Sequence, residues 1–173
     1  RASPDQLAAS LDALRALARD TDFCGSLTLV IGEEGVDLAA QLGLADHQPL
    51  LKAGNWIGPL LVASAQEGVN NLLLLGYHGK LVKLAGGIFH THHHLADGLL
   101  EVLAAIALQQ GLGVDLIKEL LASASMESAL QELQKSDCAV ADRVWQAIAQ
   151  AVELRSEAYL KRYGSWPMRV GAA

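Results

Sequence analysis

The fold is decided by the stretch Asn71-Leu72-Leu73-Leu74-Leu75, which is followed at once by Gly76-Tyr77-His78-Gly79-Lys80. Four consecutive leucines between turn-forming residues are typical of a strand that is buried on both faces, as in the centre of a parallel sheet. The glycine-bearing residues 76–80 predict a tight turn, with a short helix over residues 80–85. A second apolar run, residues 26–31, lies between two glycines and predicts another buried strand.

Helices are expected between and after these strands. Apolar residues at spacings of three and four, with caps and glycine stops, predict helices at residues 4–19, 34–42, 58–66, 95–110, 114–122, 126–134 and 138–163. Residues 50–51 could add a short strand, and residues 166–170 a final edge strand. Strand–helix alternation in the first half implies parallel pairing through right-handed crossovers, whereas the second half is mostly helical. We therefore expect a three-layer α/β domain with a small, mostly parallel sheet and a helix-rich C-terminal half.

Length and composition favour one folded domain over residues 1–173. The chain is 51% hydrophobic and 18% charged, which allows a sizeable core and argues against disorder. No apolar run reaches the roughly 18–20 residues that cross a bilayer, so no membrane association is expected. A formal charge of −6 without a basic stripe argues against nucleic acid and anionic membranes as main partners.

The cysteines indicate the cellular location of the protein, and the first residues indicate whether the chain is a fragment. Cys24 and Cys138 are isolated and no secretory signal precedes them, which predicts reduced, buried thiols in a cytoplasmic protein. The chain starts at Arg1, without Met, just ahead of a helix for which Ser3 is the expected N-cap. This start favours a fragment of a longer protein.

Histidine density is the sharpest chemical signal. Neutral imidazoles bind zinc and cobalt, but the sequence has no HExxH motif and no CxxC pair, so no protein-bound metal is expected. The cluster either supplies acid–base and hydrogen-bonding groups for a polyanionic ligand, or it caps a helix and is otherwise solvated. The glycine-rich turn and Lys80 and Lys83 beside it favour the functional reading. Five of the six histidines fall within seventeen residues: His78, His90, His92, His93 and His94.

Two other features, an acidic pair and a tryptophan, each have a functional and a structural interpretation. Asp97 and Glu101, four residues apart, either form a carboxylate pair or favour the positive end of the following helix. Trp56 either stacks on an aromatic ligand or anchors the core. Glycine-bearing turns follow candidate strands or precede helices at residues 32–35, 54–58 and 76–80, but none is a GxGxxG dinucleotide loop or a P-loop.

A longer pattern is more specific than any of these motifs. It comprises Asn55-Trp56-Ile57-Gly58, residues 73–92 with the run GKLVKLAGGIFHTH, and Ala96-Asp97. This pattern resembles the core of the CbiD-type cobalt-precorrin-5B C-1 methyltransferases. The resemblance covers most of the chain, least closely residues 114–173, and departs at Leu99, near which family members usually carry a basic residue.

The resemblance implies a function and a larger protein. It implies S-adenosylmethionine-dependent C-1 methylation of cobalt-precorrin-5B to cobalt-precorrin-6A in anaerobic cobalamin biosynthesis, with release of S-adenosylhomocysteine. Since family members are about twice as long, the chain is expected to be the C-terminal half of a two-domain enzyme. The expected partners are a cobalt-containing corrinoid precursor and the missing N-terminal half, with a homo-oligomer as an open alternative.

Under this resemblance the candidate residues divide by role. The candidate bases are His78, His90 and His92, since imidazole titrates near neutral pH. The candidates for cofactor binding are Gly76, Tyr77, Gly79 and Asn55, and those for substrate binding are Lys80, Lys83, Thr91 and Asp97. Two alternatives come from other classes: a non-catalytic corrinoid-binding domain, and a metal-dependent hydrolase built on the histidine cluster.

Overall fold

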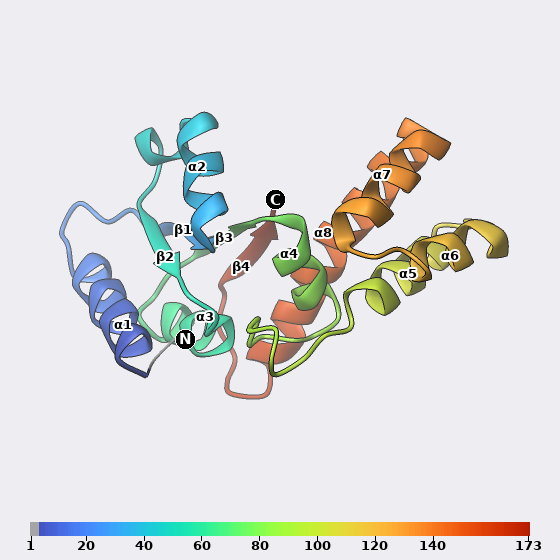
Figure 1. Ribbon diagram of the computed structural model, residues 1–173. Coiled ribbons are helices and arrows are strands. Elements are labelled where there is room, and N and C mark those ends of the chain that lie inside the picture. Colours follow the sequence, from blue (N-terminus) through green and yellow to red (C-terminus); the bar gives the residue numbers. More distant parts are fainter. Residues whose placement is uncertain (1–3) are drawn as a thin grey trace.

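Four parallel strands form the sheet in the computed structural model, which describes residues 4–173 (Figure 1). They are β1 (Ser26–Ile31), β2 (Leu50–Ala53), β3 (Asn71–Gly76) and β4 (Arg169–Ala172), in the order β2-β1-β3-β4. The predicted parallel sheet is confirmed. The last strand begins three residues later than expected, because Pro167 has no N–H group to donate to a ladder and pairing starts when Arg169 donates to the Asn70 carbonyl.

The expected helices are present, with shifted ends. They are α1 (Pro4–Ala18), α2 (Glu33–Gln41), α3 (Ile57–Gln66), α4 (His78–Ala85), α5 (Leu99–Gln109), α6 (Val114–Leu121), α7 (Met126–Ser136) and α8 (Cys138–Leu160), with a short 3-10 turn, η1 (Leu44–Asp46). Asp137 caps the last helix, since its carboxylate accepts from the Ala139 N–H at 2.8 Å. The expected cap Ser3 lies outside the described residues.

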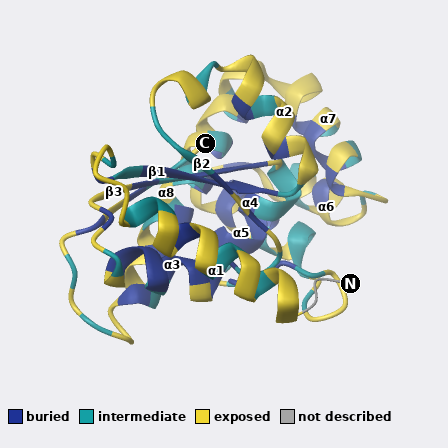
Figure 2. Ribbon diagram, turned by 90° about the vertical axis from the view of Figure 1, so that its left-hand side faces the viewer, coloured by how far each residue is buried: buried dark blue, intermediate teal, exposed yellow. Residues whose placement is uncertain are grey.

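The sheet lies between two unequal helical layers, which confirms the three-layer prediction. Figure 2 shows α2 above the sheet and α1 and α3 below it. The α2 side holds a small core of Val30, Ala39 and Leu75. Alternate residues of the same strands, such as Leu29 and Leu74, point into the main core on the other side. Helices α5–α8 gather on the β4 side of the sheet (Figure 1).

The connections change direction between the two central strands. Strand β1 leads through α2 to β2 on one side, whereas β3 leads through α4–α8 to β4 on the other side. Open α/β sheets bind ligands outside the carboxyl ends of their strands at such a switch point. The ends of the two strands are level here, because Ile31 pairs in register with Gly76.

Two local predictions are wrong. Helix α5 begins at Leu99 instead of residue 95. Residues 93–95 form a turn, the Ala96 carbonyl accepts a hydrogen bond from the Lys83 ammonium, and Leu95 is 66% exposed. Both cysteines are free as expected, but they are exposed instead of buried. Cys24 lies in the turn before β1, and Cys138 begins α8 at the surface.

No helix within residues 4–173 combines the length and the apolar character that a membrane span requires.

A candidate ligand site at the carboxyl edge of the sheet

A cleft of about 540 Å³ lies at the switch point. Its walls come from the start of α2, the β3–α4 turn, the segment before α5, and the turn that leads into α7. This volume is within the range that small-molecule sites commonly have. The polar and charged residues that line it are Glu34, Tyr77, His78, Lys80, Lys83, Thr91, His93, Asp97, Glu101, Ser125 and Glu127.

The β3–α4 turn brings backbone and side chains to the mouth of this cleft. A side chain at Gly76 would place its Cβ 3.1 Å from the Cβ of Ile31, so glycine permits the close approach of β1 and β3 at this end. Tyr77 then takes an extended conformation as the N-cap, and α4 begins at His78. The helix therefore starts two residues earlier than the sequence suggests, and its first turn faces the cleft.

His78 is enclosed by groups from two other helices and from its own turn. Its Nε2 atom lies 3.5 Å from the Glu127 carboxylate of α7, and its ring centroid lies 3.8 Å from that of Tyr77 and 6.2 Å from that of Trp145 on α8. Only 12% of the His78 side chain is exposed. Burial lowers the pKa of His78 below its ordinary value of 6.5, while the carboxylates of Glu127 and Glu34 act in the opposite direction.

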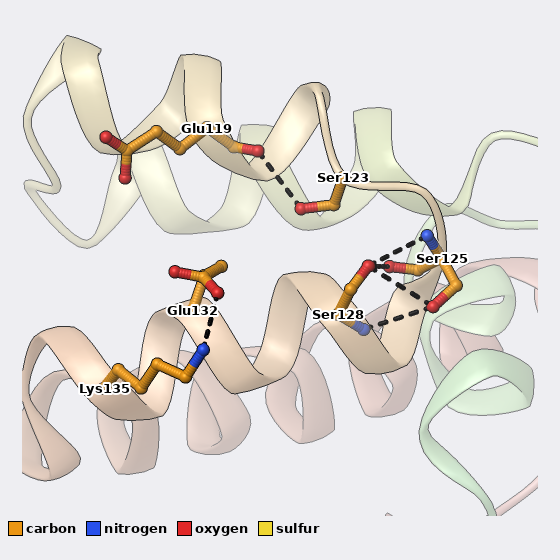
Figure 3. A network of polar contacts seen from close by, with 6 residues as sticks. All are labelled: Glu119, Ser123, Ser125, Ser128, Glu132 and Lys135. Carbon is orange, nitrogen blue, oxygen red and sulfur yellow. Dashed lines mark hydrogen bonds and ion pairs between the residues drawn. The ribbon is translucent and has the colours of Figure 1, made fainter.

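A capping box fixes the start of the helix that carries Glu127 (Figure 3). The Ser125 hydroxyl accepts from the Ser128 N–H at 3.2 Å, and the Ser128 hydroxyl accepts from the Ser125 N–H at 3.0 Å. Such reciprocal bonds satisfy two donors that a helix end otherwise leaves free. The first turn of α7, with Met126 and Glu127, is thereby held against the cleft.

Two lysines of α4 form the floor of the cleft. Lys80 Nζ lies 3.1 Å from Asn55 Oδ1 and 3.3 Å from the Thr91 carbonyl, and Thr91 Oγ1 donates to the same Asn55 oxygen at 2.9 Å. Lys83 is only 4% exposed, and its ammonium donates to the carbonyls of Thr91 at 3.4 Å and Ala96 at 2.9 Å. Within residues 4–173 neither ammonium lies within ion-pair distance of a carboxylate.

The positive charges of the cleft therefore lie at its floor, and the negative charges lie at its rim. Partial burial lowers the pKa of Lys80, the nearby charge of Lys83 lowers it further, and Glu34 acts in the opposite direction. The rim carries the carboxylates of Glu34, Asp97, Glu101 and Glu127. A ligand with both a cationic and an anionic group would find a partner for each.

The histidines of residues 90–94, the histidine segment, make other contacts than His78 of the β3–α4 turn. His90 packs edge-on against Trp56 with ring centroids 4.2 Å apart, and its buried Nδ1 atom has no hydrogen-bond partner among the described residues. His92 accepts from the His94 N–H through Nδ1 at 3.3 Å, so it stabilises its own turn. The pKa of His92 lies below 6.5 because of partial desolvation and because His93, His94 and His90 repel its charge.

The cleft collects some of the predicted residues and leaves others outside. Its lining excludes four candidates, namely His90, His92, Gly76 and Asn55. Asn55 instead borders a second cleft of about 550 Å³ between α1 and the ends of β1 and β2, and Lys80 lines both clefts. The candidates that line the first cleft are His78, Tyr77, Gly79, Lys80, Lys83, Thr91 and Asp97.

Sequence reasoning missed the groups that distant elements contribute. Glu34 lies within the glycine-bearing residues 32–35 that directly follow β1, so its place at a strand end was a signal that could have been used. Glu127 and Ser125 had no such signal, because nothing in their local sequence connects α7 to the β3–α4 turn. Trp56 packs on His90 instead of entering the first cleft.

In the part of the chain that the structure describes, no group of three or more histidine, cysteine, aspartate or glutamate side chains is arranged to hold a metal ion. The hydrolase alternative therefore gains no support from the geometry.

The family profile and the individual proteins that are similar to this chain point to the same family. The sequence profile described as "CbiD, C-terminal domain" matches residues 90–173. Over 99% of its length the chain is 62% identical to the cobalt-precorrin-5B C(1)-methyltransferase of Prochlorococcus marinus (strain MIT 9313) and 57% identical to that of Synechococcus sp. (strain CC9902). It covers 45% and 46% of these proteins, respectively, and so spans less than half of the curated relatives that it matches. No solved structure matches the chain.

Proposed function

We propose that this chain, which belongs to the CbiD family as a counterpart of its C-terminal part, forms the cosubstrate-binding part of a cobalt-precorrin-5B C(1)-methyltransferase. The whole enzyme would transfer the methyl group of S-adenosylmethionine to C-1 of cobalt-precorrin-5B, giving cobalt-precorrin-6A and S-adenosylhomocysteine. One observation carries the proposal: residues 73–92, on which the resemblance to the family mainly rests, contribute six side chains or backbone segments to the cleft at the switch point, namely Tyr77, His78, Gly79, Lys80, Lys83 and Thr91.

The reaction chemistry defines what the site has to do. The new bond joins the methyl carbon to C-1, and the methyl–sulfur bond breaks with its electron pair left on sulfur. The leaving group is a neutral thioether, so it needs no proton. The protein therefore has to align donor and acceptor and keep water out, for which a cleft between several elements is suited.

The charges of the cleft support a cationic cosubstrate. The sulfonium of S-adenosylmethionine would lie near the carboxylates of the rim, among them Glu34 and Asp97. Gly79 has no side chain to cover the backbone beside Tyr77 in the lining of the cleft, so a nucleoside could approach closely there. In this arrangement Lys80 and Lys83, with Thr91 between them, face the acidic side chains of the corrinoid.

Calorimetric titration of S-adenosylhomocysteine into the 173-residue chain tests the proposal. We expect saturable binding near one site per chain. Gly79→Leu should weaken it at least about tenfold, because the added side chain enters the first cleft, where its Cβ would lie 4.0 Å from Leu99 Cδ1 and so fits without a clash. Ser10→Leu is the matched control, since it fills the second cleft. A folded chain that binds no S-adenosylhomocysteine would refute this assignment.

A corrinoid-binding domain without the cosubstrate site is the second candidate. It is favoured by the two ammonium groups that share the Thr91 carbonyl without a carboxylate partner among the described residues. Binding of a corrinoid carboxylate by the chain, together with no binding of S-adenosylhomocysteine, would support this function over the first.

A further inference from the structure

Glu127 is the one carboxylate within ion-pair distance of a candidate base in the described part of the chain. We propose that Glu127 is a positioning residue for His78. Its carboxylate accepts a hydrogen bond from the Nε2–H of His78, which leaves the lone pair on Nδ1 to take up the proton that the corrinoid releases on methylation. The inference rests on the proposed function. It adds to the candidate site a residue from α7, in the helical C-terminal region.

Charge balance gives the reason for a base. S-adenosylmethionine loses its positive charge when the methyl–sulfur bond breaks, and the methylated macrocycle gains that charge. Loss of one proton from the macrocycle restores its original charge, with the electron pair of the broken bond to hydrogen left on the ring system. An imidazole that is neutral before the methyl transfer can accept this proton. The proton transfer needs no oxidant, reductant or metal.

The position of His78 separates it from the other two candidate bases. It lines the cleft, while the other candidates, His90 and His92, lie outside that lining. A neutral imidazole has one N–H donor and one lone pair, so a carboxylate next to one nitrogen determines which nitrogen can act as the base. Because Glu127 lies next to Nε2, the available lone pair is on Nδ1.

Charged and titratable groups face His78 from α7, from α2 and from its own turn. Glu127 reaches it from α7, Glu34 acts from α2, and Tyr77 and Lys80 belong to the same turn. Trp145 of α8 covers another side at 6.2 Å between ring centroids. Only the Glu127 contact is short enough to select a nitrogen, and the capping box at Ser125 holds its helix end in place.

Nuclear magnetic resonance of the imidazole nitrogens in the 173-residue chain tests the pairing without an activity assay. In the native chain we expect the His78 proton on Nε2. In Glu127→Gln the pKa of His78 should be lower than in the native chain, because the carboxylate that favours the charged imidazole is gone. Glu132→Gln on the same helix is the matched control, since that carboxylate pairs with Lys135 at 2.8 Å (Figure 3).

Kinetics of the full-length enzyme then test the role. For Glu127→Gln we expect kcat to fall about tenfold with little change in KM, and the acidic limb of the pH–rate profile to move to lower pH. Glu132→Gln should leave both unchanged. A proton on Nδ1, or a His78 titration unchanged in Glu127→Gln, would refute this inference and leave the proposed function standing. Failure of S-adenosylhomocysteine to bind would refute the proposed function while the nitrogen assignment remained valid.

Discussion

The β3–α4 turn and the histidine segment share a high density of polar residues, but the structure gives them different surroundings. At the turn, His78 lies against α7 and α8 and is 12% exposed. In the histidine segment, His93 and His94 are exposed and lie against one another, with ring centroids 4.0 Å apart. The difference shows that distant elements decide which histidine sits in an enclosed environment, whereas the number of histidines in a segment does not.

Loss of the enclosed histidine should have the largest effect. In the full-length enzyme we expect His78→Ala to reduce kcat by about 100-fold, which is the lower range for loss of a general base. His94→Ala should stay within about twofold, because that side chain is outside the cleft. Steady-state rates measured with both substrates at saturation provide the comparison. Equal losses in the two variants would remove the functional distinction between the regions.

The next effect concerns what holds the histidine segment in place. Lys83→Met removes an ammonium that donates to the carbonyls of Thr91 and Ala96 but keeps most of the apolar volume. We expect the free energy of unfolding to fall by about 1–2 kcal/mol, because the partly buried Ala96 carbonyl loses its side-chain donor and the Thr91 carbonyl keeps only Lys80. Chemical denaturation of the chain measures this change.

Hydrogen exchange locates the same effect in the fold. Amides of residues 92–98 should exchange about tenfold faster in Lys83→Met, while those of β3 keep their protection. Uniformly faster exchange would mean that Lys83 stabilises the whole domain instead of this segment. Unchanged exchange would mean that the two carbonyl contacts contribute nothing.

The sheet could be predicted from the sequence because its signals are local. The leucines of β3 and the apolar run of β1 identify buried strands without reference to any other part of the chain. The start of α5 could not be predicted in this way, since the helical pattern continues back to Leu95. The contact between Lys83 and the Ala96 carbonyl, thirteen residues away, ends that pattern.

The candidate site was predictable only on the side that the turn supplies. The histidine cluster, together with the glycine-rich turn and the lysines beside it, favoured a functional role for this region, and the cleft lies beside the turn. Glu127 comes from a helix whose sequence shows an ordinary amphipathic pattern, and its approach to His78 depends on how α7 packs against α8. Sequence density also favoured His92, whose Nδ1 atom instead accepts a backbone N–H of its own turn.

The smallest effect should appear in the pH dependence of stability. Because burial lowers the pKa of folded His78 below 6.5, the unfolded chain binds more protons in the range just below pH 6.5. The free energy of unfolding should therefore decrease as the pH falls from 7.5 to 5.5, and it should decrease less in His78→Gln. His92 shifts in the same direction, so its contribution remains in that variant and the difference isolates His78. Urea denaturation at the two pH values measures this difference. If the free energy of unfolding changed equally with pH in the native chain and in His78→Gln, the pKa of His78 would be the same in the folded and the unfolded chain.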